Sequence, residues 1–203
     1  MDESQFDRNG SVDRSHVDEH TTSEATAVAL GPADYARACV AAYCGGSPAP
    51  PAPADPFYGT VAACFCSIKK RGDLRGCIGT LTPAEPDLGR EIARNAYAAA
   101  YQDPRFPPLR PEELGDLSFS VDVLSPSQDC TVDELDPSRY GVLVTSGWRR
   151  GVLLPDLSGV DTVARQLSIV LQKAGIAPGE PYRLERFTVA RYGHGAGCDV
   201  ACG

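Results

Sequence analysis

The heptapeptide Leu74-Arg75-Gly76-Cys77-Ile78-Gly79-Thr80 carries most of the structural and chemical information in this chain. It follows an alternating apolar run, 61–68, and a basic turn, 69–73, and it precedes an amphipathic helix that we expect to begin near Glu85. This order predicts a strand, a loop with two glycines and a helix. Such a loop would bring an arginine, a thiol and free backbone N–H groups together, so we treat it as the candidate site.

The segments around the heptapeptide alternate between helical and strand periodicity. Upstream, we expect a helix from Pro32 to the Gly45-Gly46 pair, a proline-rich connector over 47–56 and a strand over 57–68. Downstream, we expect a helix over 85–101, a strand over 119–123, a hairpin of 141–146 with 151–154, a helix over 163–174 and a strand over 182–192. Because hairpins make antiparallel pairs, this pattern favours an α+β fold over a doubly wound parallel sheet.

Length and composition indicate one globular domain with polar ends. The chain has 203 residues, of which 42% are hydrophobic and 23% are charged. Residues 1–24 hold −5 of the net charge of −8, so we expect 1–29 to be a disordered acidic tail. The domain then spans 30–192, and 193–203 form a flexible tail with glycine and cysteine. No export signal and no membrane-length apolar run is present, which predicts a cytoplasmic protein that does not enter a membrane.

The eight cysteines are predicted to be free thiols, because the chain is long enough to bury a core without disulfides. Cys198 and Cys202, with His194 upstream, resemble part of a metal cluster, but a frayed tail is the better interpretation, so no metal is predicted. All three histidines lie in the tails. The domain therefore has no imidazole for a Cys-His or Ser-His pair.

Cys77 is the candidate catalytic residue. A thiol becomes nucleophilic when a nearby arginine or helix N-terminus favours its thiolate, and Arg75 is two residues away. In a regular strand the two side chains would share a face. The alternative is a small buried thiol beneath the glycines, with Arg75 paired to a carboxylate.

Gly76 and Gly79 also allow two interpretations. They could form a nest of backbone N–H groups that binds phosphate, with Arg75 and Thr80 adding donors. The spacing matches neither a Walker loop nor a dinucleotide fingerprint, so no cofactor is predicted. The simpler interpretation, which we favour for the glycines alone, is a positive φ or the close approach of another backbone. Arg75 still raises the odds of a bound carboxylate or phosphate.

Four further residues complete the candidate binding set. Arg94 belongs to a polar helical stripe that could be solvated or could line a groove. Asn95 lies nearer the apolar face and needs buried partners, for which the backbone of the heptapeptide is one choice. Arg149 and Arg150 follow Trp148 at a hairpin tip. They could contact nucleic acid or a protein, or they could bind carboxylates of the domain itself.

These stretches resemble the AMMECR domain family. Besides the heptapeptide, the segments that carry the resemblance are 91–96, 103–109, 121–126, 141–155, 171–175 and 182–187. The resemblance covers roughly residues 33–191, about four-fifths of the chain. It implies one body built on a mostly antiparallel, barrel-like sheet with helices outside and two unequal lobes. Both ends of the chain and the proline-rich connector lie outside the pattern.

The resemblance also implies a function. The chain is similar to the stand-alone member of the AmmeMemoRadiSam type, system protein A. Such proteins often accompany a Memo-type protein, related to metal-dependent dioxygenases, and a radical S-adenosylmethionine enzyme. The resemblance thus implies an accessory or catalytic subunit that helps these partners modify a nucleotide, RNA or protein target, with its site at Leu74–Thr80. The alternative is a non-catalytic binding module that recognises a partner protein or a small anion.

Overall fold

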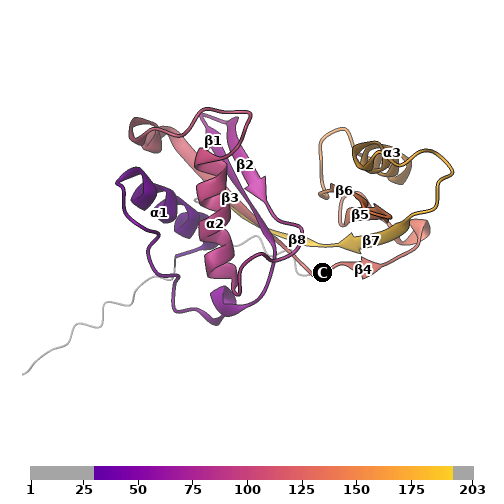
Figure 1. The fold of residues 1–203 in the computed structure, drawn as a ribbon, viewed down its shortest axis with the longest axis horizontal. Helices are drawn as coiled ribbons and strands as arrows, with labels where there is room; N and C mark the ends of the chain where they lie inside the picture. Colours follow the sequence, from indigo (N-terminus) through magenta and orange to yellow (C-terminus); the bar gives the residue numbers. More distant parts are fainter. Residues whose placement is uncertain (1–29, 194–203) are drawn as a thin grey trace, which may run out of the picture.

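In the computed structural model, which describes residues 30–193, the chain forms two lobes joined by two neighbouring segments (Figure 1). The elements of the first lobe are α1 (Pro32–Cys44), β1 (Cys64–Lys70), β2 (Asp73–Gly79), α2 (Leu88–Tyr101), β3 (Leu117–Leu124) and β8 (Val189–Gly193). Those of the second lobe are β4 (Gln128–Asp129), β5 (Gly141–Ser146), β6 (Arg149–Leu153), α3 (Val163–Ala174) and β7 (Arg183–Phe187). Short 3₁₀ helices occupy Pro56–Gly59, Pro111–Asp116 and Val132–Glu134.

Each lobe contains one antiparallel sheet with helices on one face, which confirms the expected α+β class. The strand orders are β2-β1-β3-β8 in the first lobe and β4-β7-β5-β6 in the second. The strands within residues 30–193 do not close into a barrel, because β2 and β6 each remain at the edge of their own sheet. The chain crosses between the lobes after β3 and again between β7 and β8, where the Ser125 N–H donates to the Thr188 carbonyl oxygen at 3.0 Å.

The first lobe is held by packing of α1 and α2 on its sheet. Asp87 caps α2, because its carboxylate accepts the N–H of Arg90 at 2.8 Å. Ile92 and Ala96 of α2 are fully buried together with Cys66 and Ile68 of β1. Burial also raises the pKa of the Cys39 thiol on α1 to about 11, so that this cysteine serves as a small apolar core residue.

The second lobe repeats this arrangement with β5, β6 and α3. Thr162 caps α3 through the N–H of Arg165, and the helix ends at Gly175 in the left-handed conformation. A Cβ at Gly151 of β6 would lie 2.5 Å from the Val170 carbonyl oxygen of α3, so the glycine is what lets this helix approach the strand. A smaller apolar core between the lobes is built on Ala63, Leu124 and Phe187.

Several predicted boundaries were wrong. The strand expected over 57–68 begins at Cys64, because Pro56 opens a 3₁₀ turn capped by the Asp55 carboxylate. The helix expected from Glu85 begins at Leu88, after Pro86 and the Asp87 cap. The strand expected over 182–192 is two strands, one for each sheet. Among residues 30–193, no helix is both long and apolar enough to span a bilayer.

Candidate functional site

The heptapeptide is an edge strand and not the loop that we expected. Residues Asp73–Gly79 form β2, with Cys77 opposite Ser67 and Ile78 opposite Cys66 of β1. The register shifts at Arg75, because Ile68 pairs with Gly76 whereas Lys69 pairs with Leu74. Arg75 is therefore the extra residue of a bulge, which changes the direction of its side chain relative to that of Cys77.

The two glycines of β2 permit close packing and do not form a nest. Neither adopts a positive φ. A Cβ at Gly76 would overlap the backbone carbonyl oxygen of Ala99, which belongs to α2. A Cβ at Gly79 would overlap the Phe65 ring and lie 2.6 Å from the Cys64 carbonyl oxygen. The extended backbone of this strand differs from the curled backbone that a phosphate-binding nest requires.

An ion pair from the proline-rich segment after α2 clamps the backbone of Cys77. The Asp103 carboxylate accepts the Cys77 N–H at 2.9 Å, and the Arg105 guanidinium donates to the Cys77 carbonyl oxygen at 3.1 Å. The two side chains bind each other at 2.6 Å, and Asp103 is buried. These hydrogen bonds hold the pKa of Asp103 far below its ordinary range, first of all through Arg105. The clamp fixes Cys77 and satisfies the free edge of β2 at this residue.

The Cys77 thiol is half-buried, and its neighbours are polar. The Ser67 hydroxyl donates to the Cys77 sulfur at 3.1 Å. The pKa of Arg105 is raised, mainly by its hydrogen bond to the Asp103 carboxylate. Residues 30–193 contain no histidine, so within this described part of the chain a proton acceptor for the thiol would have to be a carboxylate or water.

Arg75 is paired with a carboxylate, as one of the two interpretations expected. Its Nη2 and Nε donate to the Glu113 oxygens at 2.9 and 3.1 Å, and Lys70 binds the same carboxylate at 2.9 Å. These contacts, led by the one with Arg75, lower the pKa of Glu113 to about 2. The Arg75 Nη1 atom is buried and has no hydrogen-bond partner within residues 30–193. A groove of about 630 Å³ lies here between β2 and the 107–113 segment, and it includes Arg110.

Thr80 and Asn95 meet at a buried carboxylate, Glu91, which no local sequence pattern marks as part of the site. Glu91 is fully buried in α2 and accepts the hydroxyl of Thr80. It also accepts the N–H groups of Ala84 and Glu85 at 2.9 and 2.8 Å and the Asn95 amide at 3.3 Å. Asn95 is buried, but its amide donates at 2.9 Å to Cys64 of β1 and not to the heptapeptide.

The other predicted binding residues lie in two further places. Arg94 is half-exposed; it reaches Glu85 at 3.7 Å and the Asn95 side-chain oxygen at 3.3 Å. Arg149 is bound by Glu180 and by the Gly175 carbonyl oxygen, so it holds the second lobe together. Arg150 is exposed on β6. The structure thus separates the pair at 149–150 from the residues around β2.

Three further residues of the site were missed because their sequence signals are weak. Glu113 and Ser67 looked like ordinary surface positions, and Glu91 interrupted an otherwise apolar helix face. Asp103 and Arg105 lie two residues apart and can pair locally, but no sequence signal shows that they hold Cys77. The cysteine cluster considered at 194–202 lies outside the described residues. Among residues 30–193, no group of three or more His, Cys, Asp or Glu side chains is arranged to hold a metal ion.

The carboxylate of Glu113 predicts a dependence of stability on pH. Because its pKa falls from the ordinary 4.5 to about 2 on folding, its contribution is complete above pH 4.5 and is lost as pH falls toward 2. We expect this group to account for about 2 kcal/mol of the loss in unfolding free energy between pH 5 and pH 2. Urea denaturation of wild type and Glu113→Gln at several pH values measures the difference.

The neighbouring Glu112→Gln variant is the control, because Glu112 is exposed and makes no ion pair within the described part of the chain. Its stability should follow the pH dependence of the wild type. If Glu113→Gln also followed the wild-type curve, the ion pairs of Glu113 would make no net contribution to stability.

The chain is similar to known proteins over most of the residues that the structure describes. The family model described as AMMECR1 matches residues 33–194. A protein from Thermotoga maritima is 54% identical over 134 residues, which are 64% of this chain and 77% of that protein. A protein from Clostridium acetobutylicum is 52% identical over 128 residues, but these are 63% of this chain and only 27% of that longer protein.

A solved structure shows a similar fold. The crystal structure of an uncharacterised protein from Pyrococcus horikoshii has a TM-score of 0.72 and 27% sequence identity, and the match covers 80% of this chain and 89% of that one. Residues 33–194, which the family model matches, include both lobes and every residue of the candidate site between Ser67 and Glu180.

Proposed function

The chain belongs to the AMMECR1 family, and from this membership and the chemistry beside β2 we propose that it is an accessory subunit that binds an anionic group of a nucleotide, RNA or protein target during modification of that target. The observation that carries the proposal is the groove where Lys70, Arg75 and Arg110 converge. Guanidinium and ammonium groups in a groove suit the oxygens of a phosphate or carboxylate.

The groove keeps an excess of positive charge, because Lys70, Arg75 and Arg110 line it together with two carboxylates, Glu112 and Glu113. Glu113 neutralises part of the positive charge by sharing its two oxygens between Lys70 and Arg75. The Arg75 and Glu113 side chains are only 11% and 15% exposed, so their pair is built into the wall of the groove. Arg110 and the partly exposed Lys70 stay within reach of a ligand. An incoming anion would compete with Glu113 for the same donors.

The acid–base chemistry near Cys77 supports a binding role over a catalytic one. Asp103 contacts the Cys77 backbone and Glu113 contacts Arg75, and both carboxylates have strongly lowered pKa values because of their arginine partners. A carboxylate of low pKa is a weak base at neutral pH. The described residues offer no imidazole in its place. Reactive chemistry would then come from a partner.

The proposed partners are a Memo-type protein and a radical S-adenosylmethionine enzyme. The proposed location is the cytoplasm. The six cysteines within residues 30–193 are free thiols, which supports a reducing compartment. In this arrangement the domain would bind the anionic part of the target, and a partner would catalyse the reaction.

Titration of the full chain with inorganic phosphate and AMP, followed by calorimetry at low salt, tests the groove. We expect saturable millimolar binding that weakens about fivefold in Lys70→Ala and in Arg110→Ala, because each loses one cationic donor. Glu113→Gln should bind about threefold more tightly, because the competing charge is gone. Arg165→Ala, an exposed arginine on α3, is the control and should bind like wild type.

Absence of saturable binding, or equal binding by the Lys70, Arg110 and Arg165 variants, would contradict the proposal.

A reactive thiol at Cys77 is the second candidate, favoured by the Ser67 hydroxyl that donates to its sulfur. Cys77→Ser separates the two candidates, because an anion-binding subunit should keep its phosphate affinity in this variant. Labelling of Cys77 by iodoacetamide much faster than of Cys130 would favour the thiol.

A further inference from the structure

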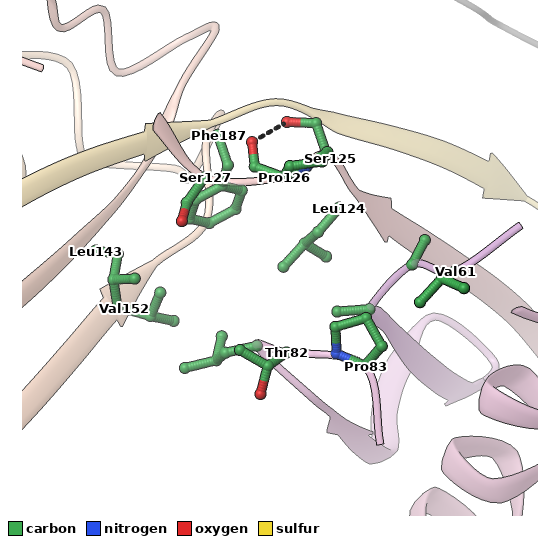
Figure 2. A pocket seen from close by; sticks show the side chains of 13 residues that line it. Val61, Thr82, Pro83, Leu124, Ser125, Pro126, Ser127, Leu143, Val152 and Phe187 are labelled. Atoms are coloured by element: carbon green, nitrogen blue, oxygen red, sulfur yellow. Dashed lines mark hydrogen bonds between the residues drawn. The ribbon is translucent and has the colours of Figure 1, made fainter. Parts of the chain in front are cut away.

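A cavity of about 180 Å³ lies between the two lobes (Figure 2). Val61 and Leu81 line it from segments of the first lobe that adjoin β1 and β2, whereas Leu143 and Val152 line it from β5 and β6 of the second. Leu124, at the end of β3, completes the wall where the chain crosses between the lobes. The cavity is separate from the basic groove, with which it shares no lining residue.

The lining is neutral and mostly apolar. It contains no charged side chain. Of its three hydroxyl groups, that of Ser127 donates to Glu185 at 2.8 Å, and that of Ser125 donates to the Pro126 carbonyl oxygen and accepts the Thr188 N–H. Thr82 supplies the third hydroxyl. A ligand here would therefore gain mainly from burying apolar surface.

The size of the cavity points to a single ring or a branched hydrocarbon group. The cavity is partly open to solvent, because Val61 and Pro126 on its lining are exposed, so a ligand would replace water that covers its apolar walls. An apolar cavity of about 150 Å³ is enough to take up benzene. Water finds few side-chain partners on this lining, so its replacement by an apolar group would be favourable.

We propose that the interlobe cavity is a binding site for a neutral small molecule that buries one aromatic or branched aliphatic group, and that its occupant stabilises the packing of the lobes on each other. The small apolar core that joins the lobes contains cavity-lining residues from both: Ala63 and Leu124 from the first, and Phe187 and Val152 from the second. A bound ring would extend that core. The site is independent of the anion groove.

The test uses the full chain with toluene and indole as neutral probes and benzoate as a charged one. We expect saturable NMR shifts of amides on both walls, such as Ala63 and Leu143, with the neutral probes, and a rise of a few degrees in the unfolding midpoint. Benzoate should give neither effect, because the lining offers no partner for its charge. This comparison requires no variant.

Val152→Phe fills the cavity from β6 and should abolish the shifts. Val132→Phe is the matched control, because Val132 is 47% exposed and does not line the cavity. Absence of saturable shifts in the wild type, equal shifts with benzoate, or undiminished shifts in a folded Val152→Phe variant would overturn the proposal. Phosphate titration of the same samples reports on the basic groove separately, so that failure of either proposal can be recognised.

Discussion

Gly76→Ala is expected to lower the free energy of unfolding by about 3 kcal/mol, because the added methyl group would overlap a backbone atom of α2. The atom is the Ala99 carbonyl oxygen, which belongs to the helix backbone and cannot move aside as the end of a side chain could. To accept the methyl group, α2 would have to shift away from β2. Urea denaturation monitored by circular dichroism measures the loss.

Gly59→Ala is the control for this result. Gly59 is exposed, has no positive φ, and has nothing within 4 Å of an added Cβ. The free energy of unfolding of the Gly59→Ala variant should therefore stay within about 1 kcal/mol of the wild-type value. If Gly76→Ala were equally mild, contact between helix and strand would not be the reason for glycine in β2.

Glu91→Ala is expected to cost about 4 kcal/mol of stability, because it removes the acceptor of four buried or half-buried donors. The donors are the hydroxyl of Thr80, the N–H groups of Ala84 and Glu85, and the amide of Asn95. In addition, hydrogen exchange at Ala84 and Glu85 should become faster, because their N–H groups lose their partner. Urea denaturation and exchange resolved by residue measure the two effects.

Glu91→Gln separates the effect of the negative charge on stability from the effect of the side-chain shape. It keeps the length and one oxygen, so we expect a smaller loss, about half that of Glu91→Ala. Glu112→Ala, at an exposed glutamate, should change stability by less than about 0.5 kcal/mol. Unchanged exchange at Ala84 and Glu85 in Glu91→Ala would mean that another group holds the 81–85 segment, of which residues 81–83 line the interlobe cavity.

Local sequence signals predicted the three helices and the hairpin of β5 with β6. Helical spacing and Gly45-Gly46 marked α1, and the turn Gly147-Trp148 marked the hairpin, whose tip leaves Trp148 91% exposed. These elements depend on residues close together in the chain, which is why they could be predicted. The division of the strands between two sheets depends on long-range pairing, and it was not predicted.

The heptapeptide was misjudged because glycine is rare inside strands and common in loops. Gly76 lies in a strand for a tertiary reason, the approach of α2, which no local pattern reveals. The same limit applies to the site. The partner of Arg75 is Glu113, and the clamp on Cys77 comes from Asp103 and Arg105, all of them more than 25 residues away along the chain. The candidate residues could be chosen from the sequence, but their partners could not.

The double crossing between the lobes has a consequence for evolution and for engineering. Leu124 and Val189 are opposite each other on adjacent antiparallel strands, although 64 residues separate them in the chain. The whole second lobe thus occupies the position of a turn in the β3–β8 hairpin. Such a lobe can be gained, lost or exchanged as a module, because its entry and exit points are neighbours. A short turn placed between Leu124 and Val189 would leave every strand of the first sheet in its original order.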